Sequence, residues 1–377
     1  MRRSPLHIGV DGRELLGRPT GVGRYLFQVL QAWASDASWP HRVSVILPET
    51  PPEAVVAAFG NRIGWTVAPG PSSGTTWEQW QLPLALRRIG IDVLLAGAYT
   101  APVVRVCPFV VIVYDVSFFA HPEWFRKREG LRRRVLTKRA ARHATEVITI
   151  SEFSASEIVH WTGVPRDRIT LAAPGAPAVI RTASAGRDPV VLFVGSLFTR
   201  RHVPDLIHGF ALAVADVPDA RLVLVGDNRT EPKIDPRAVA TAAGVGDRVV
   251  WREYVTDAEL DALYESARVF AFLSDYEGFA MTPLEAIAHG VVPVLLDTAV
   301  AHEVYGDAAA YVAADQAAIG GALTRLLTDG GARGQHLHAG RERLRQFSWT
   351  DTAATISAAL ERAAGPVPPA APASAAP

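Results

Sequence analysis

Short apolar runs alternate with longer helical patterns along most of this 377-residue chain, and that alternation constrains its fold more than any other feature. The apolar runs are nearly continuous, which is typical of parallel strands covered by helices on both faces of a sheet. The predicted strands are His7–Val10, Arg42–Leu47, Asp92–Ala96, Phe109–Tyr114, Glu146–Ile150, Val190–Val194, Arg221–Val225, Arg248–Trp251, Val269–Leu273 and Val291–Leu296.

The segments between these runs have the apolar spacing of amphipathic helices. Near residues 176–189 the periodicity lapses into Gly, Pro, Ser and Arg, which indicates a domain boundary. We therefore predict an α/β fold of two doubly wound Rossmann-like domains, residues 1–180 and 187–347, facing across a cleft that is the expected ligand site. The predicted helices include Gly23–Ala34, Trp124–His143, Pro204–Ala215, Asp257–Ala267 and Pro283–His289.

The bulk composition narrows the class of protein. A formal net charge of zero argues against a general nucleic-acid binder. The one cysteine, Cys107, cannot form an internal disulfide. No apolar run reaches the length of a transmembrane helix and no signal peptide is recognisable, so we expect a cytoplasmic protein or one on the cytoplasmic face of the membrane. Residues 364–377 are rich in Pro and Ala, which predicts a disordered tail.

The most informative motif is the run of residues 274–285, which places Glu277 and Glu285 eight residues apart across a loop-to-helix junction. Thr282 is the predicted N-cap and Pro283 the first helical residue. Carboxylates accept hydrogen bonds from hydroxyls and amides before a helix favour an anion, so the run suits a nucleotide-diphosphate sugar. The alternative is a capping box in which Glu285 bonds only the Thr282 amide. The amides expected to face the ligand are those of Gly278, Phe279, Ala280 and Met281.

Two arginines follow the first predicted strand of the second domain, in the loop that begins with Gly195 and Ser196. Arg200 and Arg201 offer forked donors that match phosphate oxygens. Solvated surface arginines are the alternative. The position of the loop at the carboxyl end of a strand, in the same domain as the glutamate motif, favours a binding role.

Gly21 and Gly23 open a predicted helix, where a phosphate could approach the backbone closely, although a plain turn is the simpler interpretation. The third glycine position of the dinucleotide fingerprint holds Leu26, which disfavours an NAD-dependent oxidoreductase. The chain also has no phosphate-binding loop with Gly-Lys-Ser/Thr, no Gly-x-Ser-x-Gly, no His-Glu-x-x-His and no Asp-x-Asp. We therefore expect neither a metal nor a cofactor besides a nucleotide sugar as co-substrate.

Asp115 ends another apolar strand, where it could meet a substrate hydroxyl or cap the following segment; both interpretations stay open. The segment 126–142 holds nine Lys or Arg and one acid, Glu129. Its expected apolar stripe is Leu131, Val135 and Leu136. A solvated helix is one interpretation, and a surface for anionic lipid or a lipid-diphosphate acceptor is the other.

Together these segments resemble the retaining glycosyltransferases of family 4, which have the two-domain GT-B fold, and within them the bacterial polysaccharide mannosyltransferases. The resemblance covers about residues 6–363. The motifs that carry it are Glu277-x7-Glu285, Val194–Leu197 with Arg200-Arg201, Val10–Arg13 with Gly21–Tyr25, Ile150–Ser154, Asp257–Leu260 and Trp349.

The resemblance implies a role for each motif. Glu285 would bond the ribose hydroxyls of the nucleotide, Glu277 would contact the donor sugar, and Asp115 would face the sugar or the acceptor. The diphosphate would be held by Arg200, Arg201 and the amides of residues 278–281, with Gly21 to Gly23 approaching from the other domain. A last helix over residues 348–363 would cross back to an acceptor-side N-terminal domain, leaving residues 187–347 as the nucleotide-sugar-binding domain.

The chain departs from the family pattern at some positions. Arg201 stands where Lys is usual, and Ala280-Met281-Thr282 replaces a more common Gly-Leu-Pro. The predicted activity is metal-independent, retaining transfer of a hexose, with mannose as first expectation, from a GDP- or UDP-linked donor to a glycan or lipid-linked acceptor in polysaccharide or glycolipid synthesis. The alternatives are a GT-B-type nucleotide-sugar epimerase, which needs no acceptor, and a non-catalytic glycosyltransferase partner subunit.

Overall fold

The computed structural model describes residues 5–17, 21–70, 74–177, 181 and 186–365. Its contacts divide the chain into two compact units. Unit 1 takes the described residues of Met1–Ile150, Ser154–Ala173 and Trp349–Pro377, and unit 2 those of Ser151–Phe153 and Pro174–Ser348. Most of the predicted disordered tail, from residue 366 on, lies outside the described residues.

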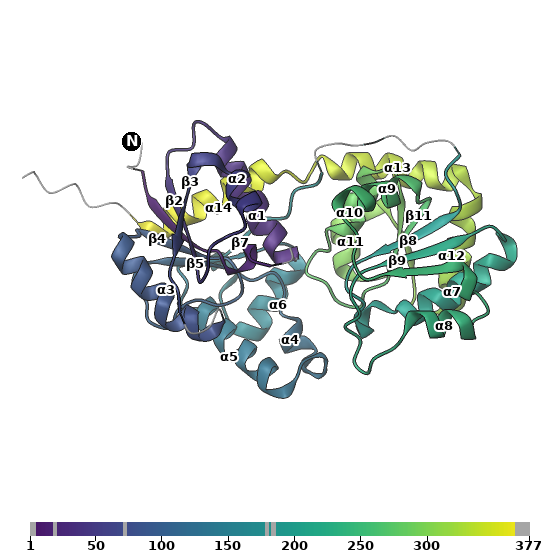
Figure 1. The fold of residues 1–377 in the computed structure, drawn as a ribbon, viewed down its shortest axis with the longest axis horizontal. Helices are drawn as coiled ribbons and strands as arrows, with labels where there is room; N and C mark the ends of the chain where they lie inside the picture. The colour runs from purple at the N-terminus through teal and green to yellow at the C-terminus, as the bar shows by residue number, and fades with distance from the viewer. Residues whose placement is uncertain (1–4, 18–20, 71–73, 178–180, 182–185, 366–377) are drawn as a thin grey trace, which may run out of the picture. The chain divides into compact units, whose positions relative to one another are not determined.

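Unit 1 is built on a seven-stranded parallel sheet in the order β3-β2-β1-β4-β5-β6-β7 (Figure 1). The strand order reverses between β1 and β4, which are hydrogen-bonded neighbours although two strands separate them in sequence. The strands are β1 (His7–Asp11), β2 (Arg42–Leu47), β3 (Ile63–Val67), β4 (Val93–Ala96), β5 (Phe109–Ile112), β6 (Glu146–Thr149) and β7 (Ile169–Leu171).

Helices cover both faces of this sheet because right-handed crossovers that run in opposite directions along it place their helices on opposite faces. Helices α1 and α14 pack together on one face, while one apolar core cluster joins α3, α5 and α6 on the other. The helices of this part of the chain are α1 (Gly21–Ser35), α2 (Glu53–Ala57), α3 (Thr75–Ile89), α4 (Ser117–Ala120), α5 (Lys127–His143), α6 (Glu152–Thr162) and α14 (Trp349–Ala364).

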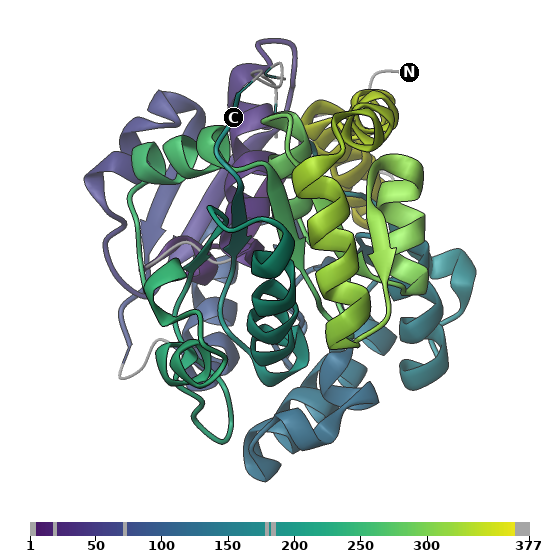
Figure 2. The ribbon, with the colours of Figure 1, turned by 90° about the vertical axis from the view of Figure 1, so that its right-hand side faces the viewer.

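Unit 2 has a six-stranded parallel sheet in the order β10-β9-β8-β11-β12-β13, which reverses between β8 and β11. Helices α7 and α12 pack against each other on one face, and α10 packs against α13 on the other (Figures 1 and 2). The strands are β8 (Val190–Val194), β9 (Arg221–Val225), β10 (Val249–Arg252), β11 (Val269–Phe272), β12 (Val292–Leu296) and β13 (Ala310–Val312). The helices are α7 (Val203–Asp216), α8 (Pro236–Ala242), α9 (Asp257–Ser266), α10 (Thr282–Ala288), α11 (Ala299–Tyr305), α12 (Gln316–Thr328) and α13 (Gly330–Leu344).

The prediction of two doubly wound parallel-sheet units is confirmed. Strands β3, β7 and β13 are absent from the predicted set, and each is an edge strand of its sheet. Edge strands need no continuous apolar run, because one side of the strand lacks a partner, so their sequence signal is weak.

One local prediction is wrong. Helix α10 begins at Thr282 and not at Pro283, with Met281 at the N-cap position and no side-chain hydrogen bond from that cap. The reason is that Met281 is already helical (φ −81°, ψ −29°). Two residues of the expected apolar stripe of the basic helix, Leu131 and Val135, are both 57% exposed. Helix α5 instead buries small residues, namely Gly130, Thr137, Ala140 and Ala141.

Candidate functional site

The candidate site of unit 2 lies where the strand order of its sheet reverses. The chain leaves β8 through the loop that holds Gly195 to Arg201, and it leaves the neighbouring strand β11 through the loop that holds Ser274 to Met281. The connections after these two strands run in opposite directions, so their loops diverge and leave a crevice at the carboxyl ends of the strands. Open parallel sheets bind their ligands at such a position.

Arg201 and Glu277 meet at this point from the two loops. The Arg201 guanidinium donates from Nη2 and Nε to Glu277 Oε1, at 2.9 and 3.1 Å. Its Nη1 donates to the Ser196 carbonyl at 2.9 Å. A guanidinium carries five N–H donors, and these bonds use three of them. The remaining two have no partner among the described residues and suit the oxygens of a diphosphate.

The Glu277 carboxylate is held through one of its two oxygens, Oε1. The Ser274 hydroxyl also donates to Oε1, at 2.9 Å, so three donors converge on that oxygen, and within the described part of the chain none reaches Oε2. Burial by itself would raise the pKa of Glu277, but the charges of Arg201 and Arg200 and the Ser274 hydrogen bond outweigh burial and lower it. Glu277 is therefore a carboxylate whose Oε2 can accept a hydrogen bond from a sugar hydroxyl.

Glycines let the two loops and the guanidinium approach so closely. A Cβ on Gly195 would lie 2.6 Å from Arg201 Nη1, and one on Gly226 would lie 2.0 Å from the Gly195 carbonyl oxygen. Both residues also have positive φ values, 147° and 141°, which L side chains rarely adopt. The position of Arg201 therefore depends on the absence of a side chain at these two positions.

Arg200 lies over an aromatic ring next to Arg201. Its Cζ is 4.3 Å from the centroid of the Phe198 ring, and Arg201 Cζ is 4.7 Å from that of Phe272. Planar guanidinium groups stack favourably on aromatic faces. The two rings thus support two cations at the carboxyl edge of the sheet, where the sequence predicts them.

The loop from Gly278 to Met281 is anchored through its carbonyl groups. The Ser151 hydroxyl donates to the Gly278 carbonyl at 2.6 Å, and the Tyr305 hydroxyl donates to the carbonyls of Phe279, at 3.0 Å, and Ala280. Ala280 adopts a left-handed conformation (φ 62°). That conformation accounts for the glycine expected here, since a Cβ costs free energy in the left-handed region.

Glu285 is buried, with 8% of its surface exposed, on the first turns of α10. The Tyr264 hydroxyl donates to its Oε2 at 3.1 Å, and the Tyr264 ring stacks on His289 with centroids 4.9 Å apart. Helix α9 thus orients the Glu285 carboxylate through a residue that the glutamate motif does not contain.

Two family models match consecutive parts of the chain. The family described as "Glycosyltransferase Family 4" matches residues 19–178, and "Glycosyl transferases group 1" matches residues 180–343. The chain belongs to the family-4 glycosyltransferases. As a glycosyltransferase it takes its sugar from a nucleotide-sugar donor.

This glycosyltransferase is similar to two curated relatives in sequence and to one solved structure in fold. It is 28% identical over 264 residues to "O-antigen chain mannosyltransferase B" of Escherichia coli, covering 66% of this chain and 69% of the relative. It is 26% identical over 227 residues to "Serotype-specific mannosyltransferase WbdA" of Escherichia coli, covering 56% of this chain but only 28% of that relative. Anabaena Alr3699/HepE, in complex with UDP and glucose, has the same fold: the TM-score is 0.74 at 17% identity, over 95% of this chain and 100% of that one.

The remaining predicted site residues of this glycosyltransferase belong to unit 1. Gly21 and Gly23 lie in the first turn of α1, after β1. Asp115 follows β5: its Oδ1 accepts from the Ser117 amide at 2.8 Å and its Oδ2 from the Tyr99 hydroxyl at 3.2 Å. Asp115 does not occupy the N-cap of helix α4, which is Val116 and has no side-chain cap hydrogen bond, and its role toward a sugar or acceptor stays a prediction.

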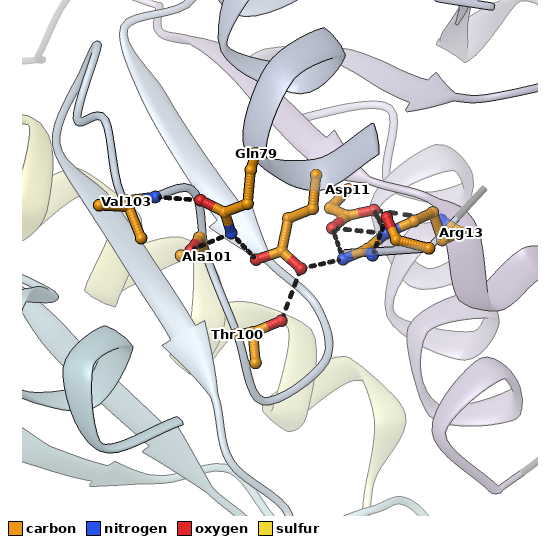
Figure 3. Close-up of polar contacts among 8 residues, drawn as sticks. Asp11, Arg13, Gln79, Thr100, Ala101 and Val103 are labelled. Atoms are coloured by element: carbon orange, nitrogen blue, oxygen red, sulfur yellow. Dashed lines mark hydrogen bonds and ion pairs between the residues drawn. The ribbon is translucent and has the colours of Figure 1, made fainter. Parts of the chain in front are cut away.

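Sequence reasoning missed a buried charged cluster at the reversal point of the unit 1 sheet (Figure 3). Arg13 Nη2 donates to Asp11 at 2.7 Å and to Glu78 at 2.9 Å, and the Thr100 hydroxyl donates to Glu78 at 2.7 Å. Burial opposes the charge of Arg13, but the two carboxylates outweigh burial and raise its pKa. Asp11 and Arg13 stand in a family motif, whereas Glu78 lies inside an unremarkable helix and gives no sequence signal.

Sequence reasoning gave no role in the site to Asp227, Tyr264 or Tyr305 of unit 2. Asp227 accepts from the Ser196 hydroxyl at 2.5 Å and thereby ties the loop after β9 to the loop after β8. Among the described residues, no group of three or more His, Cys, Asp or Glu side chains could hold a metal ion. In the same part of the chain, no helix is long and apolar enough to cross a membrane.

Proposed function

We propose that this glycosyltransferase transfers a hexose, with mannose as the first candidate, from a GDP- or UDP-linked donor to a glycan or lipid-linked acceptor, with retention of the anomeric configuration. The observation that carries the proposal is the convergence of Arg201 and Glu277 at the reversal point of the unit 2 sheet. A cation with donors available and a carboxylate with an available oxygen stand side by side there. A diphosphate joined to a hydroxylated sugar needs both groups.

The chemistry of transfer explains why the cations matter. When the bond between the anomeric carbon and the diphosphate breaks, negative charge grows on the leaving group. Donors that are already held in position by Ser196, Phe198 and Phe272 stabilise that charge without reorganising. Arg200 and Arg201 would therefore act on the transition state more than on the ground state. No metal is required in this scheme.

The two glutamates would bind the two hydroxylated ends of the nucleotide sugar. Glu285, oriented by Tyr264, would accept hydrogen bonds from the nucleotide ribose, and Glu277 Oε2 from a hydroxyl of the sugar. The amides of Gly278 to Met281 would add donors to the diphosphate. Mannose is favoured by the names of the two relatives, and polysaccharide synthesis is favoured by the O-antigen chain named for one of them.

The test is a donor panel with purified protein in the presence of EDTA. GDP-mannose, UDP-glucose and related donors are incubated without acceptor, and free sugar and nucleoside diphosphate are quantified. We expect slow hydrolysis of one donor, with the liberated sugar initially in the α-configuration if the transfer is retaining. Isomerisation of the donor would favour an epimerase, and binding without any sugar release would favour a non-catalytic subunit. Dependence of turnover on an added divalent cation would contradict the metal-independent scheme.

A further inference from the structure

His202 ends the loop that carries the two arginines of the candidate donor site. It directly follows Arg201 and stands at the N-cap position of helix α7. Its backbone is left-handed (φ 47°, ψ 35°), a conformation that is uncommon for a residue with a Cβ. Such a conformation persists where surrounding contacts determine it, so the contacts of this side chain need an explanation.

The His202 ring lies between two carboxylates that come from different elements. Its Nδ1 is hydrogen-bonded to Asp205 Oδ2, in the first turn of α7, at 2.9 Å. Its Nε2, which is buried, faces Asp275 Oδ2 in the loop after β11, also at 2.9 Å. The side chain therefore joins the start of α7 to the loop that holds the glutamate motif.

The charge of the His202 ring decides whether both contacts are favourable. A carboxylate only accepts hydrogen bonds, and a neutral imidazole has one N–H and one lone pair. Whichever nitrogen keeps the proton, the lone pair of the other nitrogen would face a carboxylate oxygen at 2.9 Å. The imidazolium has an N–H on each nitrogen and suits both sides. Burial opposes that charge, but the two carboxylates outweigh burial and raise the pKa of His202 above 6.5.

The contact between His202 and Asp275 lies beside a second link between the same two loops. Arg201, the residue before His202, pairs with Glu277, two residues after Asp275. The Asp275 amide also donates to the Arg200 carbonyl at 3.0 Å. A backbone hydrogen bond and two neighbouring charged pairs thus tie the loop after β8 to the loop after β11.

The charged groups around the His202 ring come from several elements. Helix α7 contributes Asp205 and the loop after β11 contributes Asp275. The arginines of the same loop are directed elsewhere, Arg200 onto an aromatic ring and Arg201 onto a carboxylate of the other loop. Helix α12 contributes a neutral side-chain amide, which reaches Asp205 at 3.4 Å. In the described part of the chain, the ring thus faces two carboxylates.

We propose that His202 is a positioning residue of the donor site, whose imidazolium form holds the loop after β11 against the loop after β8. Loss of the proton turns one of its two contacts into a repulsion, which loosens the loop that presents Glu277 and the amides of residues 278–281. Affinity for the nucleotide sugar therefore falls as pH rises through the raised pKa of His202. By linkage, donor binding takes up a fraction of a proton. The inference rests on the proposed function, because it concerns the regulation of the same site.

The test is calorimetric titration of the full chain with GDP-mannose and with UDP-glucose, at about pH 6 and about pH 8.5. The diphosphate of a nucleotide sugar is esterified at both ends, so its charge does not change in this range. We expect the donor that binds to do so about three- to tenfold more weakly at the higher pH, which is the effect of one partly exposed charged contact. Titrations in buffers of different ionisation enthalpy should show proton uptake on binding.

Two variants assign the pH dependence to this contact. His202→Gln and Asp275→Asn should each remove it and should bind the donor, at both pH values, about as weakly as wild type does at the higher pH. His302→Gln is the matched control, since His302 Nε2 pairs with one carboxylate, Asp297, at 2.7 Å on the surface of the same unit. It should keep the pH dependence of wild type.

The outcomes separate this proposal from the proposed function. Equal wild-type affinity at the two pH values would overturn the role of His202 and leave the proposed function standing. No binding of either nucleotide sugar at either pH would overturn both. A His202→Gln variant with a lower unfolding temperature but an unchanged pH dependence of donor affinity would show that the residue serves the fold alone, and would overturn the proposal as well.

Discussion

The Arg201 guanidinium and the Glu277 carboxylate form two hydrogen bonds to a single oxygen, Glu277 Oε1, at 2.9 and 3.1 Å. Both side chains are largely shielded from solvent, with 12% and 19% exposed. Because one side of each group is used by the other, each is held in place with its other side available to a ligand. A partly buried ion pair of this kind positions charge more than it stabilises the fold.

Replacing Arg201 by Ala should lower turnover on the order of 100-fold or more, because it removes a cation aimed at the leaving diphosphate. Arg201→Lys should recover a large part of that loss, since it restores the charge. Steady-state kinetics with the preferred donor measures both. Arg345→Ala, which removes an exposed arginine paired with Glu342, is the control and should be silent. Turnover of Arg201→Ala within about threefold of wild type would refute the role.

Gly195→Ala removes no polar group, yet it should reduce both turnover and nucleotide affinity. The new Cβ would lie 2.6 Å from Arg201 Nη1 and would push the guanidinium out of position. Gly321→Ala in α12, where a Cβ meets nothing within 4 Å, is the matched control and should preserve activity. Equal activities for the two variants would show that the position of Arg201 does not matter.

Ala280→Gly should stabilise unit 2 by about 1 kcal/mol, because it removes a Cβ from the left-handed region. The gain is partly offset by the greater freedom of glycine in the unfolded chain. Thermal unfolding followed by circular dichroism measures the difference. A lower unfolding temperature for the variant would mean that the Ala280 methyl group makes a packing contact worth more than the strain.

The surroundings of His202 predict that the free energy of unfolding depends on pH. Its Nδ1 faces Asp205 and its Nε2 faces Asp275, each at 2.9 Å. Burial opposes its charge, but hydrogen bonds to the two carboxylates outweigh burial and raise its pKa above the ordinary 6.5. Stability from this group is therefore fully present below the unfolded pKa and is lost as pH rises through the folded pKa.

The His202→Gln variant tests this dependence. It should be destabilised relative to wild type more at about pH 5.5 than at about pH 9. Denaturant unfolding of both proteins at the two pH values provides the comparison. A difference that is larger at the higher pH would contradict the assignment.

The sequence predicts those features of the fold and the site that depend on residues close together in the chain. The central strands, the Glu277–Glu285 spacing and the position of Arg200 and Arg201 after β8 all follow from local patterns, and the structure places them as expected. The register of the first turn of α10 does not follow, because Met281 becomes helical only after the left-handed Ala280 has turned the chain.

Contacts between distant segments lie beyond local patterns. Tyr264 reaches Glu285 from another helix, and Glu78 reaches Arg13 across 65 residues of sequence. The exposure of Leu131 and Val135 also depends on which side of α5 packs, and small residues decide that because they let the helix approach the sheet closely.

The central claim is that a nucleotide-diphosphate sugar binds at the reversal point of the unit 2 sheet. It is tested most directly by calorimetric titration of GDP and UDP into wild type, Glu285→Gln and Arg201→Ala in the presence of EDTA. We expect wild type to bind one of the two nucleotides, Glu285→Gln to weaken that binding by about 1.5–3 kcal/mol, and Arg201→Ala to weaken it as well. Unchanged affinity in both variants, or no binding of either nucleotide to wild type, would contradict it.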